Sequence, residues 1–346
     1  MKEIGSEFWK PNIEYFHVNE TAFLCGRTAL DAIIKDAKEE KNIKSVLLPS
    51  YCCHTMIEPF VDNEINIRFY DVFSDEDGLL KANPPEPLEN EAFYIMTYFG
   101  DVHLKGIEGV DRWPCSIEDM THSCFCQNYQ SLADYYFISY RKWFAVDGIA
   151  IAGKKNGQLS GGSRTNQKYA ALRNDAFELK DRYIKGENID KGQFLSEFNE
   201  AEEYLSGDYK GYTAELNSII DLQKFISNID RIRKQRRKNA KVLIDGIKDI
   251  QEIVPMVDFS ASEECPLFLA VCVKGGKRDA LRKFLIERDI YLPVHWPLSE
   301  FHNGISKRAQ RVYEEELSLV CDQRYNEEDM ERMVNTIKEF WKEYKR

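Results

Sequence analysis

Two short apolar runs, each followed by polar residues, most constrain how this chain can fold. The first run, residues 115–117, leads into Asp119, and the second, residues 135–138, leads into Ser139 and Lys142. Apolar runs of this length are typical of strands buried on both faces, as in parallel sheets. Open α/β sheets bind ligands at the carboxyl ends of their strands. We therefore expect Asp119, Ser139 and Lys142 to meet at one edge of a mostly parallel sheet.

A carboxylate, a hydroxyl and a lysine at such an edge match the needs of pyridoxal phosphate (PLP). PLP withdraws electrons when its pyridine nitrogen stays protonated, its aldehyde is held by a lysine as a Schiff base and its phosphate is anchored. Asp119 is the candidate for the pyridinium proton, Lys142 for the Schiff base and Ser139 for the phosphate. Taken singly, Asp119 could cap a helix, Ser139 could cap a turn and Lys142 could be a surface lysine. Their shared position at the carboxyl ends of strands favours a PLP site.

Five segments resemble motifs of the DegT/DnrJ/StrS sugar aminotransferase family, which belongs to fold type I of the PLP enzymes. Residues 118–123 resemble its E-D-A-A-[QH]-S/A signature, and residues 134–142 resemble a shortened form of its G-D-x-x-x-F-S-F-x-x-x-K element. Residues 25–30 resemble S-G-T-A-A-L, and residues 292–298 resemble P-V-H-Y-P-P-L. Residues 317–330 resemble the closing element of the family. The segments occur in the family's order, so the resemblance extends over most of the chain.

The resemblance implies further cofactor contacts. In the family, backbone amides at the turn that matches Gly26, Arg27 and Thr28 hold the phosphate, and the start of a helix there favours an anion on physical grounds. His122 matches a position beside the cofactor ring, although it could equally be a buried histidine that forms hydrogen bonds. These four residues are therefore candidate cofactor-binding residues.

The chain departs from the family pattern at two places. Where the family places an aromatic side chain over the PLP ring, this chain has Cys53, so we expect Tyr51 or His54 to cover the ring instead. The family's G-x-N-Y-R-M segment, which contributes across a dimer interface, has no clear counterpart between Gly153 and Asn217.

Three residues are candidates for substrate contact. Arg141 could pair with the phosphate, pair with an acid group of the substrate or point to solvent. His295 and Trp296 lie between two prolines in the segment that resembles P-V-H-Y-P-P-L. They could line the substrate pocket or belong to the core of the small domain.

The expected fold is an α/β fold of type I, with a mostly parallel seven-stranded-type sheet flanked by helices and a smaller C-terminal α/β domain. We expect the large PLP-binding domain at residues 1–230 and the small domain at residues 231–346. The expected strands of the large sheet are residues 45–48, 66–71, 92–97, 114–118, 134–138 and 148–152. The expected helices and small-domain strands are a first helix from Gly26, a long helical pattern over residues 215–247, a strand at 267–273, a helix at 277–287, a strand at 290–294 and a last helix at 326–344.

Composition excludes several classes of protein. The net charge of −11 argues against a nucleic-acid partner, and the basic run at residues 231–238 is expected to be a solvated helix face. No apolar run approaches the roughly 18 residues that a membrane span requires, and the start of the chain lacks the core of a signal peptide. The nine scattered cysteines do not suggest a disulfide framework, so we expect a cytoplasmic protein.

The expected activity is transamination, with Lys142 as general base and acid. The resemblance implies L-glutamate as amino donor, a keto sugar or sugar nucleotide as acceptor, and a role in surface polysaccharide or secondary-metabolite biosynthesis. It also implies a homodimer with the active site at the subunit interface. Alternatives are another PLP reaction (elimination, decarboxylation or aldol cleavage), a regulatory protein without turnover, and a metal protein built on Cys124-x-Cys126 with His122. The last has tighter cysteine spacing than the usual C-x₂-C pair, so no metal is expected.

Overall fold

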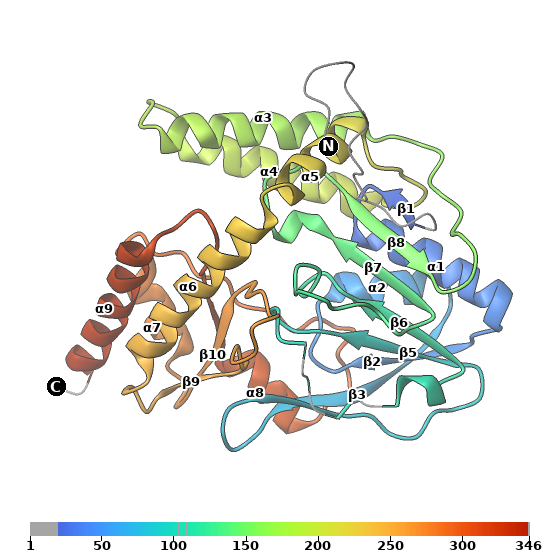
Figure 1. The fold of residues 1–346 in the computed structure, drawn as a ribbon, viewed down its shortest axis with the longest axis horizontal. Coiled ribbons are helices and arrows are strands. Elements are labelled where there is room, and N and C mark those ends of the chain that lie inside the picture. The colour runs from blue at the N-terminus through green and yellow to red at the C-terminus, as the bar shows by residue number, and fades with distance from the viewer. Residues whose placement is uncertain (1–19, 103, 105, 108, 345–346) are drawn as a thin grey trace, which may run out of the picture.

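A computed structural model describes residues 20–344 except 103, 105 and 108. Its centre is an eight-stranded sheet with the order β1-β8-β7-β6-β5-β2-β3-β4 (Figure 1). The strands are β1 (Glu20–Phe23), β2 (Ser45–Pro49), β3 (Asn66–Ser74), β4 (Leu80–Asn83), β5 (Glu91–Met96), β6 (Cys115–Asp119), β7 (Tyr135–Ser139) and β8 (Ala150–Lys154). The five central strands, β7, β6, β5, β2 and β3, are parallel, so their carboxyl ends share one edge. The fold class predicted from sequence is confirmed.

The six predicted strands of the large sheet are all present, but the sheet has eight strands where seven were expected. The two additional strands, β1 and β4, have four residues each and pair antiparallel with β8 and β3 at the edges of the sheet. Edge strands this short give too few alternations for a sequence pattern to reveal them.

Helix α1 (Gly26–Lys41) packs against β7 and β8 through a buried stripe of apolar residues. The stripe includes Ala29, Leu30, Ile33, Ile34 and Ala37, at the spacing that places side chains on one helix face. The start at Gly26 agrees with the prediction from sequence. This packing holds the amino end of α1 against the carboxyl end of β7.

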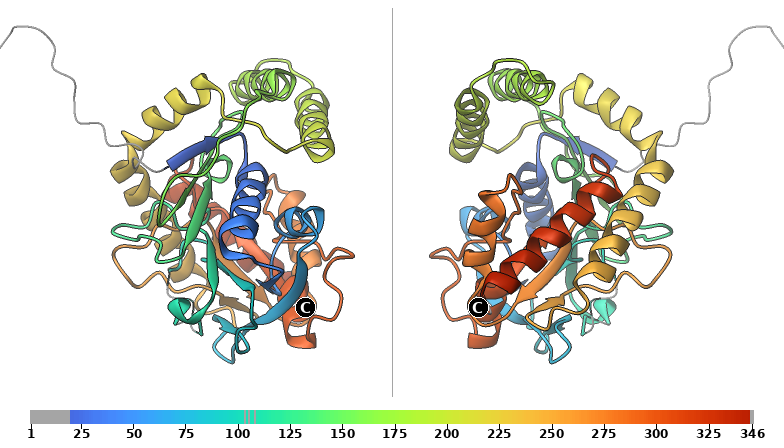
Figure 2. Two further views of the ribbon diagram at one scale, coloured as in Figure 1. Left: turned by 90° about the vertical axis from the view of Figure 1, so that its right-hand side faces the viewer. Right: turned by 90° about the vertical axis from the view of Figure 1, so that its left-hand side faces the viewer.

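A pair of helices, α3 (Gln167–Ile184) and α4 (Lys191–Gly207), packs side by side and forms the top of the molecule in Figures 1 and 2. The predicted long helix over residues 215–247 is instead two helices, α5 (Leu216–Ile226) and α6 (Ile229–Ile247). The break falls where the side chains of Ser227 and Asn228 both donate hydrogen bonds to the carbonyl of Lys224. Such local bonds compete with helical hydrogen bonding. Among the described residues, no helix is long and apolar enough to cross a membrane.

The C-terminal part of the chain contains a small antiparallel sheet with the order β11-β10-β9. Its elements are β9 (Ile253–Pro255), β10 (Leu269–Val273), α7 (Arg278–Ile286), α8 (Lys307–Glu315), β11 (Glu316–Leu319) and α9 (Glu327–Tyr344). The predicted β10, α7 and α9 are confirmed, but the predicted strand at residues 290–294 is wrong. That segment contributes the Pro293 carbonyl to a bond from Ser318 N–H, and β11 takes the place beside β10. Pro293 has no N–H to donate, which disfavours a strand there.

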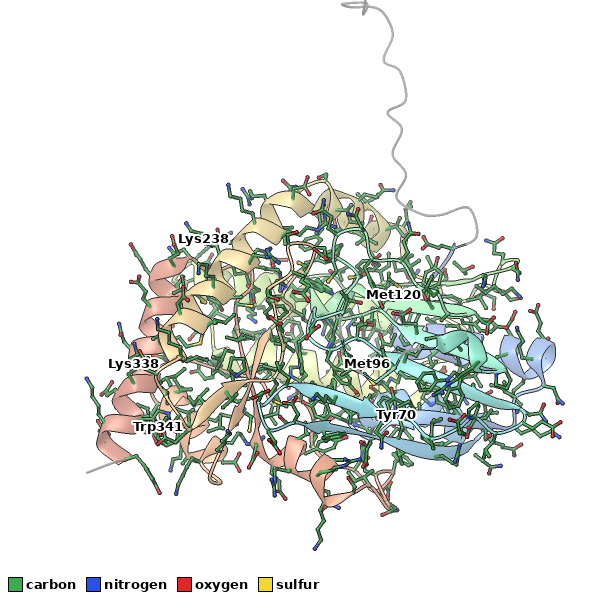
Figure 3. All side chains as sticks on the ribbon, turned by 60° about the horizontal axis from the view of Figure 1, so that its bottom comes forward. Tyr70, Met96, Met120, Lys238, Lys338 and Trp341 are labelled. Atoms are coloured by element: carbon green, nitrogen blue, oxygen red, sulfur yellow. The ribbon has the colours of Figure 1, made fainter. Side chains whose placement is uncertain are left out.

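The proposed boundary between residues 230 and 231 lies near the start of α6, a helix that packs against α9, and it stays a prediction. Buried apolar side chains fill the interior in the parts of the chain before and after this helix. Met96 ends β5 and Met120 follows β6, and both are buried, whereas Lys238 on α6 is exposed (Figure 3).

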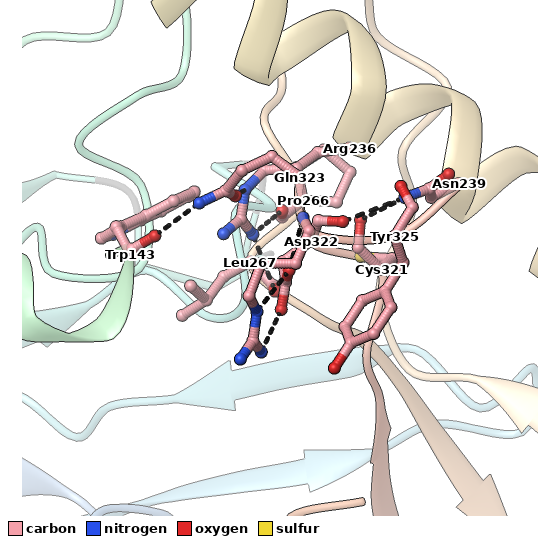
Figure 4. Close-up of polar contacts among 10 residues, drawn as sticks. Trp143, Arg236, Asn239, Pro266, Leu267, Cys321, Asp322, Gln323 and Tyr325 are labelled. Atoms are coloured by element: carbon pink, nitrogen blue, oxygen red, sulfur yellow. Dashed lines mark hydrogen bonds and ion pairs between the residues drawn. The ribbon is translucent and has the colours of Figure 1, made fainter. Parts of the chain in front are cut away.

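The basic run on α6 is only partly the solvated face that was expected. Arg231, Lys234 and Lys238 are exposed, but Arg236 is 1% exposed. Its guanidinium donates to the carbonyls of Pro266 and Leu267 and to Gln323, and it lies 4.5 Å from the ring centroid of Trp143 (Figure 4). Arg236 therefore joins α6 to the loop before β10 and to the segment after Lys142.

Substituting Arg236 with alanine should lower the free energy of unfolding by about 2–4 kcal/mol, because it leaves two carbonyls without their donor and removes the contact with Trp143. Denaturant unfolding followed by circular dichroism measures the change. Arg231→Ala on the exposed face of the same helix is the control, with an expected change within about 0.5 kcal/mol. Equal changes in the two variants would contradict this account.

Candidate active site

A cavity of about 470 Å³ lies where the carboxyl ends of β6 and β7 meet the amino end of α1 and one face of α4. Eight of the twelve candidate residues line it: Gly26, Arg27, Asp119, His122, Ser139, Arg141, Lys142 and Trp296. The structure therefore brings together residues that are up to 270 positions apart in sequence. The other four, Thr28, Tyr51, His54 and His295, are not among the lining residues.

Asp119 is the last residue of β6 and is 2% exposed. One carboxylate oxygen accepts a hydrogen bond from the Thr121 amide (2.9 Å), and the other accepts one from the Tyr94 hydroxyl (3.0 Å). Burial raises the pKa of Asp119, while these hydrogen bonds and the charge of Lys142 act in the opposite direction. The carboxylate is thus fixed in position and lies in an environment that favours a cationic partner.

Lys142 ends the short helical turn Tyr140–Lys142 that follows β7. Within the described part of the chain, its amine forms no hydrogen bond or ion pair, although its charge acts on both Asp119 and His122. The turn is held by the Trp143 indole, which donates to the carbonyl of Thr121 (2.7 Å). Lys142 therefore presents an uncommitted amine to the cavity.

The amino end of α1 closes one end of the cavity. Cys25 precedes the helix without capping it by a side-chain hydrogen bond, so the first amides are open to an anion. A Cβ atom at Gly26 would lie 3.2 Å from the Cβ of Ser139, so glycine allows this close approach. The Ser139 amide donates to Thr121 Oγ1 (3.1 Å), and the Ser139 hydroxyl has no partner among the described residues. The Thr28 hydroxyl points elsewhere and donates to the carbonyl of Tyr209 (2.6 Å).

His122 lies in the wall of the cavity and is 1% exposed. Its Nδ1 accepts a hydrogen bond from the Phe99 amide (3.1 Å), so the neutral ring carries its proton on Nε2. Its ring stacks on Trp296, with centroids 6.0 Å apart and planes inclined by 24°. Burial lowers the pKa of His122 well below its ordinary value, and the neighbouring His295 and Lys142 lower it further.

The stability of the protein should fall as the pH drops below about 6.5, because the unfolded chain then binds a proton at His122 that the folded protein excludes. Between pH 7.5 and pH 5.5, His122→Asn should lose roughly 1 kcal/mol less of its unfolding free energy than the wild type. Asparagine keeps an acceptor for the Phe99 amide. His54→Asn at an exposed position is the control, and denaturant unfolding at both pH values is the measurement. An unchanged pH dependence in His122→Asn would refute this assignment.

Neither Tyr51 nor His54 lines the cavity, where one of them was expected to cover the cofactor ring. Tyr51 is fully buried, donates its hydroxyl to the carbonyl of His295 and stacks on Tyr98 at 5.5 Å. His54 begins α2 (His54–Asp62) and is exposed. His295 is 6% exposed, and its Nδ1 lies 2.8 Å from the Ser318 hydroxyl. Trp296, the neighbour of His295, lines the cavity, as does Phe137 of β7.

Several lining residues were missed by the sequence interpretation. They include Cys53, Thr55, Met56, Thr121, Arg173 and Glu202. Thr121 belongs to the Glu118–Ser123 motif and could have been found there, because a threonine two residues after a strand end is well placed to bond both strand ends. Arg173 on α3 and Glu202 on α4 lie in polar helices, and no local pattern signals their approach to the cavity.

The cavity fits PLP by its own chemistry. The open amides at Gly26 and the free Ser139 hydroxyl suit a phosphate, the buried Asp119 carboxylate suits a protonated pyridine, and the unpaired Lys142 amine suits an aldehyde. Fold and cavity together define the architecture of a fold type I PLP-dependent enzyme.

Comparisons with known proteins agree with this architecture. Residues 186–338 match the model of the DegT/DnrJ/EryC1/StrS aminotransferase family, a range that begins C-terminal to Asp119 and Lys142. No curated protein sequence matches the chain. The chain is thus similar to the DegT/DnrJ/EryC1/StrS aminotransferase family over residues 186–338.

Solved structures match nearly the whole chain at low sequence identity. A putative sugar aminotransferase from Streptococcus pneumoniae in its PLP form has a TM-score of 0.62 at 14% identity, covering 92% of this chain and 86% of that one. A DegT DnrJ EryC1 StrS aminotransferase from Brucella abortus has a TM-score of 0.61 at 13% identity, with coverage of 93% and 85%. A sugar aminotransferase from Micromonospora echinospora has a TM-score of 0.60 at 15% identity, with coverage of 92% and 87%. At these identities the structures show the shared fold.

Proposed function

We propose that this protein transfers an amino group from an amino acid, with L-glutamate as the donor, to a keto sugar or sugar nucleotide. The observation that carries the proposal is the meeting of Lys142 and Asp119 at one cavity whose far end is the open start of α1. The keto sugar and the donor come from the resemblance of the chain to sugar aminotransferases, and the residues supply the amino-transfer chemistry.

The residues have distinct roles in this proposal. PLP, when bound, supplies an electron sink for the negative charge that forms at the substrate carbon. Lys142 would hold its aldehyde, Asp119 its pyridinium N–H, and Gly26 with Ser139 its phosphate. The Nζ of Lys142 would also act as the base that removes the proton from the substrate carbon and as the acid that returns it.

His122 and Trp296 shape the cavity around that proton transfer. Because burial favours neutral His122, its stacked ring adds no positive charge that would compete with a pyridinium for Asp119. Trp296 and Leu205 line the same cavity with apolar surface, which excludes water from the reacting atoms.

The setting is part of the same proposal. The nine cysteines are all free thiols, which supports a reducing compartment and a cytoplasmic location. The resemblance to the family supports a homodimer with its active site at the subunit interface and a role in surface polysaccharide or secondary-metabolite biosynthesis. The proposal also includes a division of the chain into a large domain at residues 1–230 and a small domain at residues 231–346.

The test is the absorption spectrum of the purified protein with PLP before and after L-glutamate is added. We expect a band near the visible edge that shifts to that of the pyridoxamine form, with release of a keto acid. A protein that shows no cofactor band would refute the proposal. A stable band that no amino donor changes would point to another PLP reaction and would also refute it.

A further inference from the structure

Two arginines at the cavity, Arg141 and Arg173, share one carboxylate. Nη2 of Arg141 and Nη1 of Arg173 (3.3 Å) both donate to Oε1 of Glu202 on α4. The Nε atoms of both arginines are buried and have no hydrogen-bond partner among the described residues. The hydroxyl of Tyr169, whose ring lies 5.8 Å from the Arg141 guanidinium, is also buried without a partner. Buried donors normally find acceptors, so this group of side chains is incomplete without a further acceptor.

The charges at the cavity point to an anion at the same place. Arg27 is paired with Glu58 at 3.0 Å, and Lys142 acts on Asp119, so these cations have carboxylates beside them. Among the described residues, the ion pairs of Arg141 and Arg173 share the single carboxylate of Glu202, and the charge of Asp147 also acts on Arg173. Burial lowers the pKa of Arg173, and repulsion from the charge of Arg141 lowers it further. A second negative group beside the arginines would relieve this repulsion.

Glu202 is the member of the group that can move away. Its side chain is 43% exposed, against 19% for Arg141 and 11% for Arg173. Because Glu202 is the exposed partner in these ion pairs, its carboxylate can return to water when another carboxylate takes its position. An incoming carboxylate would offer the arginines the same chemistry with two oxygens, which a guanidinium binds side on through Nε and Nη.

We propose that Arg141 and Arg173 bind a carboxylate of the substrate, and that Glu202 holds this place until the substrate carboxylate replaces it. The inference rests on the proposed function, because it assigns the substrate end of the same cavity. The cofactor phosphate has its own place at Gly26 and Ser139, so the arginine pair is left for a second anion. The proposed acid-binding site therefore consists of Arg173 on α3, Glu202 on α4 and Arg141, the residue next to Lys142.

The first test removes one arginine. Glutarate, a dicarboxylate without an amino group, is titrated into the PLP-loaded protein by calorimetry, and the Kd of PLP is measured separately by absorbance. Arg173→Gln should weaken glutarate binding about tenfold or more, the effect of losing a charge-assisted pair of hydrogen bonds, and should leave the Kd of PLP within about twofold. Arg164→Gln is the control, because Arg164 forms an exposed pair with Asp208 at 3.0 Å outside the cavity.

The second test removes the negative charge of Glu202, which occupies the proposed binding position of the substrate carboxylate. Glu202→Gln should bind glutarate more tightly than the wild type by about threefold to tenfold, because the competing carboxylate is gone. Glu200→Gln on the same helix is the control, since Glu200 pairs with exposed Lys168 at 3.5 Å and does not line the cavity. A purely structural role of Glu202 predicts the opposite sign or no change.

Each contrary result overturns the inference in a different way. Equal weakening of PLP and glutarate in Arg173→Gln would assign the arginines to the cofactor phosphate. Unchanged or weaker glutarate binding in Glu202→Gln would remove the place-holding role, and this variant decides the matter if Arg173→Gln does not fold. A wild-type protein that shows the glutamate-driven spectral shift but does not bind glutarate would overturn the inference and leave the proposed function intact. The absence of any cofactor band in the absorption spectrum would instead refute the proposed function.

Discussion

Replacing Lys142 with alanine is expected to remove the covalent link between protein and PLP and to slow transamination by about 10²–10⁴-fold. Lys142 presents the amine without a partner in the described chain, next to Asp119 in the cavity. Alanine removes both the anchor for the aldehyde and the base for proton transfer. Borohydride reduction followed by peptide mass spectrometry locates the link, and single-turnover absorbance with L-glutamate measures the rate.

Lys155→Ala provides a matched control for this experiment. Lys155 directly follows β8 as Lys142 follows β7, but it is exposed and does not line the cavity. We expect this variant to keep the link at Lys142 and the rate within about twofold of wild type. A reduced link that persists in Lys142→Ala would show that another lysine anchors the cofactor.

The large sheet was predictable because its central strands are buried on both faces. Every residue of β5, β6 and β8 is buried, so these segments are apolar enough to be recognised without an alternating pattern. Residues 290–294 mislead for a related reason. Ile290 and Leu292 are buried, which gives the alternation of a strand, and only the missing N–H of Pro293 indicates that the segment cannot extend a ladder.

The cofactor end of the site could be predicted because its residues lie close together in sequence next to strand ends. Asp119 ends β6 and Ser139 ends β7, while His122 and Lys142 lie three residues after them, so the sheet alone brings them together. The acid-binding end could not be predicted in full. Arg173 and Glu202 meet Arg141 only because α3 and α4 pack across the cavity, which is a tertiary contact between two polar helices.

Tyr51 shows why a motif position does not determine a role. The sequence places an aromatic residue near the expected ring-covering position, but it does not say toward which side of the turn the ring points. In the structure, the Tyr51 ring packs against Tyr98, Trp296 and Tyr313, and its hydroxyl finds a carbonyl acceptor. A tyrosine that is buried with its hydroxyl satisfied is more stable there than it would be against an open cavity.

Replacing Asp119 with asparagine is expected to slow the half-reaction with L-glutamate by about 10²–10³-fold while the cofactor stays linked to Lys142. Asparagine has nearly the same shape, but it carries no negative charge to hold a proton on the pyridine nitrogen. It also offers one acceptor oxygen where Tyr94 and Thr121 now donate to two. Stopped-flow absorbance with L-glutamate measures the rate, and borohydride trapping tests whether the link persists.

Glu118, the residue before Asp119, provides a control. It distinguishes the loss of a negative charge at the cavity from the loss of any buried carboxylate. Glu118 is also buried, and burial likewise raises its pKa, but it accepts a hydrogen bond from Tyr129 and does not line the cavity. Alternate residues of a strand point to opposite faces, so Glu118→Gln changes the same strand without touching the site. We expect Glu118→Gln to keep the wild-type rate with L-glutamate within about threefold. If both variants were slowed equally, the effect of Asp119→Asn would come from disturbance of β6 and not from the loss of a charge beside the pyridine nitrogen.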